Sequence, residues 1–370
     1  MKTLKLHKWA LGLVVVSAIA VTAVVFSLQE PIPAPRPVAA AEPLFPRYVH
    51  SVFSGDLSWM LDLDSAAYEN DAVYPQFQTR FIEKEVPSTW QSVEQGLARE
   101  ALLLYRDYWI AALLDPSAMD EHEQNLADSI DDLLTSHGME FKGEDAFERL
   151  QLALSAEGWG FQGGRTPPLQ DFILWRNEET VDYEVTLTDG LQPVRVNFLE
   201  DFISMGWSNF ATFGHTSTGG WANKEALYCI REHYPDLEAE RFRVAYLTHE
   251  ARHFSDYLDY PELEPADLEY RGKLTQLYFA ETEGPQYLDQ FRKTANNNTP
   301  TPHPLANWFV LERLGEILGI DAFDPDAMKD IPWNIVAQAS LELLESHSQQ
   351  LNQAGAETVT GLIAGPVSAE

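Results

Sequence analysis

A run of glycines and prolines between Gly158 and Pro168 divides this sequence into two regions of different hydrophobic periodicity. Before the run, apolar side chains recur at helical spacing in three successive segments, so three helices are expected. After it, residues 181–198 alternate apolar and polar side chains on both sides of Asp189-Gly190, which predicts a β-hairpin. Two short strands follow, and helical periodicity then returns, with helices expected at about 237–260, 265–283, 304–318 and 334–351. The chain is therefore predicted to be an α+β protein, mainly helical with a small antiparallel sheet.

The same changes in composition divide the 370 residues into five segments. We expect an export segment at 1–29, a proline-rich linker at 30–47, a helical N-terminal region at 48–160, a second domain at 161–352 and a flexible tail at 353–370. Alternating prolines in the linker favour an extended polyproline II spacer. The tail consists of small, weakly patterned residues and is expected to fray.

The first 29 residues have the features of an export segment. Lys2, Lys5 and Lys8 precede an apolar run, 9–28, that carries no charge and is long enough to cross a bilayer as a helix. Because the positive charges lie before the run, the N-terminus is expected to stay in the cytoplasm and the rest of the chain to be exported. Two outcomes remain open. The segment stays as a single-pass anchor at the periplasmic face of the inner membrane, or cleavage near 39–41 releases the protein to the periplasm.

Charge and cysteine content exclude several kinds of partner and site. The 57 acidic and 25 basic side chains give a formal net charge of -32, which repels polyanions. Nucleic acids and anionic lipid headgroups are therefore not expected partners of the folded part. The single cysteine, Cys229, excludes an intramolecular disulfide and a zinc site built from clustered thiolates. A metal site in this chain must use histidines and carboxylates.

Residues 247–254, Leu-Thr-His-Glu-Ala-Arg-His-Phe, carry the pattern that points most directly to chemistry. His249 and His253 are four positions apart, so on a helix both imidazoles lie on one face, as a metal ion requires. Glu250, between them, is suited to take a proton from a metal-bound water. The alternative is a buried helix in which the two histidines only satisfy hydrogen bonds.

A catalytic zinc ion usually has a third protein ligand, and Glu269 on the next expected helix is the first candidate. Glu281 is a rival because it extends the apolar stripe of that helix, which would make it the more buried carboxylate; Glu283 and Asp256 are further alternatives. As another possibility, Glu269 pairs only with Lys273, one helical turn later.

The combination of His-Glu-x-x-His with a following helix that carries a lone glutamate resembles the gluzincin group of zinc metallopeptidases. The resemblance implies a zincin-like catalytic core within 161–352, one zinc ion per chain bound by His249, His253 and Glu269, water activation by Glu250, and peptide bonds as substrates. In such enzymes an edge strand before the motif helix pairs with the extended substrate. The sequence places Gly219, Gly220 and Trp221 at that position. The alternative for this stretch is a glycine-rich turn with Trp221 in the core.

The sequence departs from the thermolysin-like pattern around the third ligand. Those enzymes place the ligand glutamate in an Asn-Glu-x-x-x-Asp context, whereas Leu268 precedes Glu269 here and Lys273 follows it. Asp256 could instead accept the N–H of a ligand imidazole, unless it is simply a solvated helix residue. A donor for the developing oxyanion is also needed. The candidates are Tyr270, Arg271, His215 and His303, each of which could equally serve packing, an ion pair or the surface.

These features predict an extracytoplasmic, membrane-tethered zinc metallopeptidase that acts on peptides or proteins. Two alternatives belong to other classes: a non-catalytic envelope scaffold or binding protein, with a structural metal or none, and an amidase or peptidase that acts on cell-wall peptides. Replacing Glu250 distinguishes an enzyme from a scaffold, because only the enzyme needs the proton acceptor.

Overall fold

The computed structural model describes residues 44–64, 68, 71–139, 145–299 and 301–363. The predicted export segment and most of the predicted linker lie outside the described residues. The linker had been expected to reach residue 47, but a helix already begins at Leu44. Within the described part of the chain, no helix is both long enough and apolar enough to cross a membrane.

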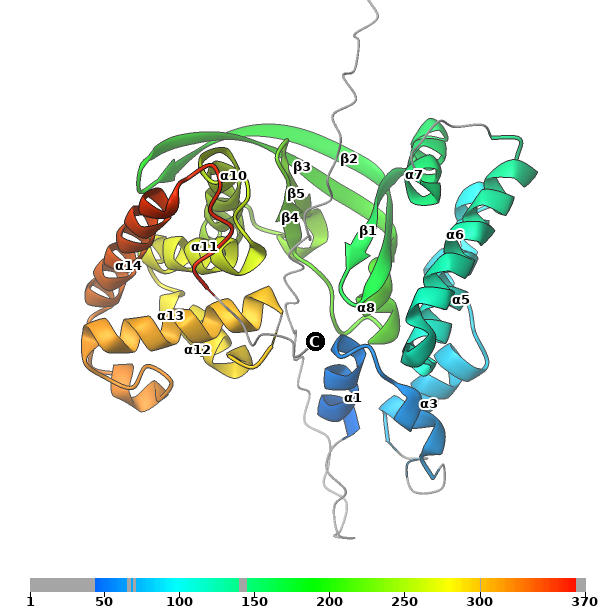
Figure 1. Ribbon diagram of the computed structural model, residues 1–370, viewed down its shortest axis with the longest axis horizontal. Coiled ribbons are helices and arrows are strands. Elements are labelled where there is room, and N and C mark those ends of the chain that lie inside the picture. Colours follow the sequence, from blue (N-terminus) through cyan, green and yellow to red (C-terminus); the bar gives the residue numbers. More distant parts are fainter. Residues whose placement is uncertain (1–43, 65–67, 69–70, 140–144, 300, 364–370) are drawn as a thin grey trace, which may run out of the picture.

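The molecule has two helical lobes connected by one long β-hairpin (Figure 1). The N-terminal lobe contains α1 (Leu44–Phe53), α3 (Val73–Phe77), α4 (Ser88–Gln91), α5 (Leu97–Leu114), α6 (Met119–Ser136), α7 (Ala146–Ala156) and α8 (Gly206–Ala211). The C-terminal lobe contains α9 (Glu240–Phe242), α10 (His249–Asp259), α11 (Pro265–Phe279), α12 (Gly284–Thr294), α13 (Pro302–Leu318) and α14 (Trp333–Ala354). The prediction of a mainly helical α+β protein is confirmed.

The three helices expected before residue 160 are present as α5, α6 and α7, with one correction. Ser88 and Gln91 together have the pattern of a helix-capping box, which predicts that the first of these helices begins at Ser88, but α4 ends at Gln91 and α5 starts only at Leu97. Gly96 separates them with φ of 154°, a backbone conformation that interrupts a helix. The start of α7 follows from its sequence, since the side chain of Asp145 accepts a hydrogen bond from the backbone N–H of Glu148.

The single sheet has the strand order β1-β2-β3-β5-β4. Its strands are β1 (Gly160–Thr166), β2 (Leu169–Leu187), β3 (Gly190–Met205), β4 (Gly220–Ala222) and β5 (Leu227–Ile230). The expected hairpin is present, but Leu187 pairs with Gly190, so its turn is one residue earlier than Asp189-Gly190. The expectation of an antiparallel sheet is wrong in one place. β5 pairs with β3 in parallel because α8 and β4 intervene and bring the chain back in the same direction.

The hydrophobic core of the N-terminal lobe does not end at residue 160. Phe161, Phe172, Trp207 and Phe210, from β1, β2 and α8, belong to the same buried cluster as the side chains of α5. The two long strands then leave this core and pack their far ends against the C-terminal lobe, where Val185, among others, joins a second cluster. The hairpin is therefore shared by both lobes.

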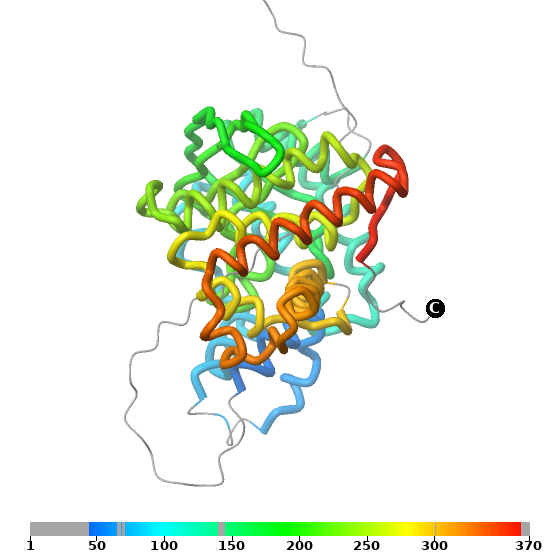
Figure 2. Tube along the Cα trace, turned by 90° about the vertical axis from the view of Figure 1, so that its left-hand side faces the viewer, coloured from blue at the N-terminus to red at the C-terminus, as the bar shows by residue number. Residues whose placement is uncertain are grey.

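The described residues that follow α14, up to residue 363, are packed, which corrects the expectation of a flexible tail for this part of 353–370. The side chains of Val359 and Ile363 are buried. The backbone N–H groups of Leu362 and Ile363 donate to the carboxylate of Asp267 at the start of α11. Figure 2 views the C-terminal lobe face on and shows α14 crossing in front of the other helices before this last segment. The tail therefore fixes the start of α11.

Candidate metal centre

The two histidines of the motif lie on a helix with an unusual start. The helix runs from Glu240 to Asp259 through α9, a π-helical turn (Arg243–Thr248) and α10. The hydroxyl of Thr248 donates to the carbonyl of Arg243, five residues earlier, at 2.7 Å. A π turn shifts the face that the following residues present, and such turns are frequent at functional sites. His249 and His253 both lie on the buried face of α10.

Helix α11 can approach these imidazoles closely because it carries Gly272. A Cβ atom at this position would lie 2.7 Å from Cε1 of His253 and 2.8 Å from Cε1 of His249. Any other residue would force the two helices or the rings apart. One turn before Gly272, Glu269 is thereby directed at the imidazoles.

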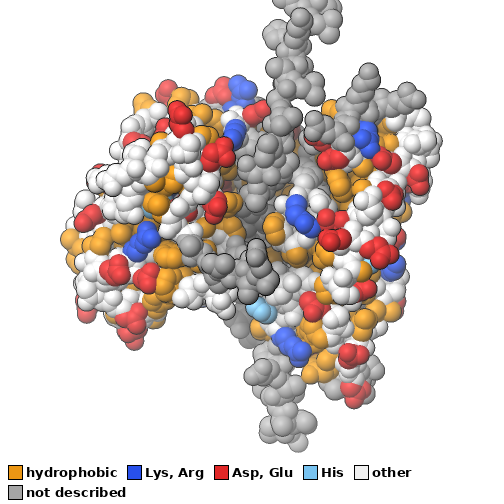
Figure 3. Space-filling view, viewed as in Figure 1, with side chains coloured by type: hydrophobic (Ala, Val, Ile, Leu, Met, Phe, Trp, Pro, Cys, Tyr) orange, Lys and Arg blue, Asp and Glu red, His pale blue; other side chains and the backbone are white. Residues whose placement is uncertain are grey.

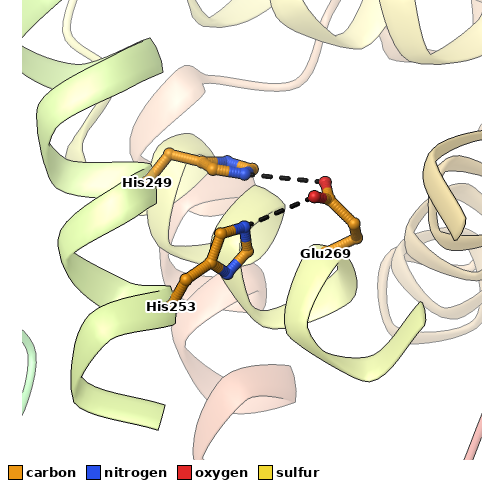
Figure 4. Close-up of side chains that lie close together, drawn as sticks. All are labelled: His249, His253 and Glu269. Atoms are coloured by element: carbon orange, nitrogen blue, oxygen red, sulfur yellow. Dashed lines mark ion pairs between the residues drawn. The ribbon is translucent and has the colours of Figure 1, made fainter. Parts of the chain in front are cut away.

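Glu269 faces both histidines across the interface between α10 and α11 (Figure 4). Its Oε1 lies 3.4 Å from Nε2 of His253, and its Oε2 lies 3.6 Å from Nε2 of His249. A tetrahedral zinc ion with ligand bonds of about 2.0–2.1 Å holds its ligand atoms about 3.3–3.4 Å apart. One ligand atom from each of the three residues lies within 4.8 Å of the others. His249, His253 and Glu269 together could therefore hold a metal ion.

The hydrogen bonding of Nε2 of His253 and the low pKa of His249 fit this interpretation, whereas the pKa of His253 is raised, because the effect of burial is outweighed by the nearby carboxylate of Glu269. Nε2 of His253 is buried and has no hydrogen-bond partner among the described residues, although Glu269 lies at ion-pairing distance. Burial, with a contribution from His253, lowers the pKa of His249 to about 4. A neutral imidazole is the form that binds metal.

Glu250 is buried on the same helix beside the cluster. Burial raises its pKa to about 7; the charge of Glu269 raises it as well, whereas His253 and Lys273 lower it. A carboxyl group with a pKa near neutrality can both accept and donate a proton at physiological pH. This is the behaviour required of a general base that later acts as an acid.

Two further groups surround the carboxylate of Glu269. Nδ1 of His303, from the start of α13, lies 2.7 Å from Oε2, and Nζ of Lys273 lies 3.3 Å from the same atom. Burial alone would raise the pKa of Glu269, but His303 and Lys273 bring it well below its usual value. The pairing of Glu269 with Lys273, an alternative from the sequence, is thus present in addition to the histidine contacts.

Asp256 does not accept a hydrogen bond from a motif histidine, which was one of the two alternatives that the sequence left open. Its carboxylate pairs with Arg252 at 2.8 Å and with Arg271 at 2.9 Å, while Nδ1 of each motif histidine lacks a hydrogen-bond partner within the described ranges. Asp256 is fully buried, so it is not a solvated helix residue either. Burial opposes its ionisation, but Arg271 and Arg252 prevail and lower its pKa. Its role is to connect α10 to α11.

The remaining candidates lie away from the cluster. Tyr270 is buried against His347 and Arg313, and Arg271 is directed at Asp256 and Ser348. His215 is exposed in a loop, where it contacts Phe45. Three of the four candidate oxyanion donors therefore make their contacts outside the cluster, and only His303 contacts it.

Glu281 is not the buried carboxylate that was expected. Helix α11 ends at Phe279, so the apolar stripe does not continue to position 281, and the side chain of Glu281 is exposed. Its backbone N–H donates to Glu240 at 2.9 Å. The geometry favours Glu269 over Glu281 as a third ligand.

Gly220 and Trp221 belong to β4, the outer strand of the sheet, next to α10, whereas Gly219 lies just before this strand. Gly220 has φ of 157°, and a Cβ atom there would lie 2.2 Å from the carbonyl oxygen of Tyr228. Trp221 is buried and stacks on the ring of Tyr228 at 5.2 Å. The stretch is therefore an edge strand rather than a glycine-rich turn, and its tryptophan lies in the core, as the alternative had it.

Sequence reasoning missed Gly272 and treated Lys273 only as a partner of Glu269. A glycine inside a strongly helical segment, three positions after the candidate ligand, was the signal that a close approach occurs there.

Comparison of the chain with protein-family models, with curated proteins and with solved structures found no match in any of the three.

Proposed function

We propose that this protein is a zinc-dependent metallopeptidase of the gluzincin type. The observation that carries the proposal is the buried cluster of two imidazoles and one carboxylate, in which the oxygens of Glu269 lie 3.4 Å from Nε2 of His253 and 3.6 Å from Nε2 of His249, with a buried Glu250 on the same helix as the histidines. The lack of thiolate ligands is compatible with zinc, since catalytic sites commonly use two histidines and a glutamate.

In the proposed mechanism, each side chain has a separate task. His249, His253 and Glu269 would hold the zinc ion, which when bound would polarise the scissile carbonyl and acidify water. Glu250 takes the proton from the attacking water and passes it to the leaving amine. The edge strand β4 binds the extended substrate by main-chain hydrogen bonds.

We place this activity on the extracytoplasmic side of the membrane, with 1–29 as the tether. That proposal rests on the sequence of the export segment, whereas the acidity of the folded part bears on the substrate. Figure 3 shows Asp and Glu side chains over both lobes of one face. Such a surface favours a peptide or protein substrate over nucleic acid.

Elemental analysis of protein purified without added metal tests the site. We expect one zinc ion per wild-type chain, and much less in His249→Ala and Glu269→Ala. Glu281→Ala is the matched control, because this carboxylate is exposed and outside the cluster. Equal zinc in wild type and both ligand variants would rule out the assignment.

Glu250→Gln tests catalysis separately from binding. The variant should keep its zinc and fold but lose about 10²–10⁴-fold of peptide hydrolysis, because the amide cannot accept the proton. Comparing denatured protein, short peptides and purified cell wall as substrates distinguishes a general peptidase from an enzyme of cell-wall peptides.

A second candidate function is a non-catalytic envelope protein. The observation that favours it is the ion pair between Lys273 and Glu269, which partly balances the buried carboxylate without any metal. For such a scaffold, Glu250→Gln would change neither partner binding nor stability beyond the effect of an ordinary buried substitution.

A further inference from the structure

Lys273 places a buried positive charge next to the carboxylate assigned to the metal. Its side chain is 6% exposed, and Nζ lies 3.3 Å from Oε2 of Glu269, one helical turn earlier on α11. Nζ also lies 3.3 Å from Nδ1 of His303 and 5.1 Å from the centre of the Phe291 ring. The ammonium group is therefore enclosed by groups of the site rather than by solvent.

The two oxygens of Glu269 have different surroundings. Oε2 is approached by His303, Lys273 and His249, at 2.7, 3.3 and 3.6 Å, whereas Oε1 faces His253. A buried carboxylate without a counter-charge is strongly destabilising. Among the described residues, the ammonium group of Lys273 is the nearest permanent positive charge that can balance the carboxylate of Glu269 when no metal is bound.

A divalent cation between the same three ligands would bring two more positive charges into this enclosure. The cation and the ammonium group would then be attracted to one carboxylate and would repel each other across a water-poor interior, where charges are weakly screened. Lys273 therefore stabilises the metal-free site and opposes metal binding at the same time. An ordinary structural salt bridge has only the first of these effects.

We propose that Lys273 is an internal counter-ion that competes with the divalent metal for Glu269. The metal-free protein thereby keeps α11 packed on α10 with its ligands in place, and its metal affinity is lower than the ligand set alone would give. The proposal rests on the metal site of the proposed function and adds a positioning residue that sets its affinity.

The test measures two properties of the full-length chain after removal of metal by a chelator. Zinc affinity is measured by competition with a chromophoric chelator, and metal-free stability by urea unfolding. Lys273→Met should bind zinc at least tenfold more tightly than wild type while unfolding at a lower urea concentration. Lys273→Gln, which keeps a hydrogen-bond donor, should change both properties in the same directions and replaces the methionine variant if that variant does not fold.

Lys329→Met is the matched control, because it removes the same charge from an exposed lysine that pairs with Asp326. It should leave zinc affinity and stability unchanged. If wild type binds zinc and neither Lys273 variant binds it more tightly, the counter-ion role is wrong and the proposed site stands. If a Lys273 variant binds zinc and wild type does not, competition is supported and the proposed function of the natural chain fails. If no protein binds zinc, both are overturned.

Discussion

Replacing Gly272 by alanine should damage the metal site more than the fold. The added methyl group would lie 2.7 Å from Cε1 of His253, 2.8 Å from Cε1 of His249 and 2.9 Å from Nε2 of His249. Ordinary carbon contacts begin near 3.4 Å, so the rings or the helix must move by about 0.5–0.7 Å. Metal–ligand distances tolerate only about 0.2 Å, so we expect zinc affinity to fall at least about tenfold.

The effect of the same substitution on stability is smaller because two contributions oppose each other. Alanine in a helix interior is favoured over glycine by about 1 kcal/mol, while overpacking costs about 1–3 kcal/mol. A net loss of about 1 kcal/mol in the free energy of unfolding is expected, measured by urea denaturation of the metal-free protein.

Gly315→Ala in α13 is the matched control. Its methyl group would lie 2.8 Å from the carbonyl oxygen of Ile320, so it introduces a comparable clash away from the imidazoles. It should lower stability without changing zinc affinity, measured by chelator competition. If Gly272→Ala bound zinc as tightly as wild type, the close approach of α11 to the two rings would not be what forms the site.

Three further predictions concern stability. Asp256→Ala leaves two buried guanidinium groups, Arg252 and Arg271, without their shared carboxylate and should lower the free energy of unfolding in urea by about 3–5 kcal/mol. Asp182→Ala, which removes an exposed ion pair, should change it by less than about 0.5 kcal/mol. Similar values for both variants would mean that Asp256 does not stabilise the contact between α10 and α11. Burial raises the pKa of Asp171 from 3.8 to about 6, so its carboxyl group binds a proton more tightly in the folded state than in the unfolded state. The stabilisation that this proton gives the folded state is therefore lost as the pH rises through about 6. The stability of wild type relative to Asp171→Asn should therefore fall by about 1.3 kcal/mol between pH 5 and pH 7, and a constant difference would show ordinary titration. Free zinc at one hundred times its dissociation constant should raise the free energy of unfolding by about 2.7 kcal/mol, and an unchanged urea midpoint would mean that zinc does not bind the folded state preferentially.

The parts of the fold that the sequence predicted are those with local causes. The helices α5, α6, α7, α10, α11, α13 and α14 and the β-hairpin were expected from the pattern of residues within each segment, and the start of α7 also follows from its cap, Asp145. The helix α12 was missed because its start is stabilised from a distance: Glu240 accepts backbone N–H groups of Thr282 and Glu283. The parallel pairing of β5 with β3 also depends on chain segments that periodicity does not connect.

The candidate site also contains residues that local spacing predicted and residues that only tertiary packing brings to the site. His249, Glu250 and His253 are related by helical spacing, and Glu269 was proposed because the next helix had to turn back on the first. His303 could not be ranked above other isolated histidines, since only the packing of α13 brings it to 2.7 Å from Glu269. The sequence also could not show that two arginines occupy the carboxylate of Asp256.

The position of Glu269 depends on how α11 is held at three levels. At its start, the carboxylate of Asp267 accepts the backbone N–H groups of Leu362 and Ile363 and lies 3.0 Å from Nε2 of His347. One turn further, Arg271 pairs with Asp256 on α10, and next to it Gly272 allows contact with the imidazoles. Glu269 lies between the first and second of these attachments, so its carboxylate cannot move away from α10 without breaking one of them. Rigid placement of this kind is what metal binding requires, because ligands that must first be ordered reduce affinity. The sequence motif supplies the ligands, whereas these tertiary contacts supply their geometry.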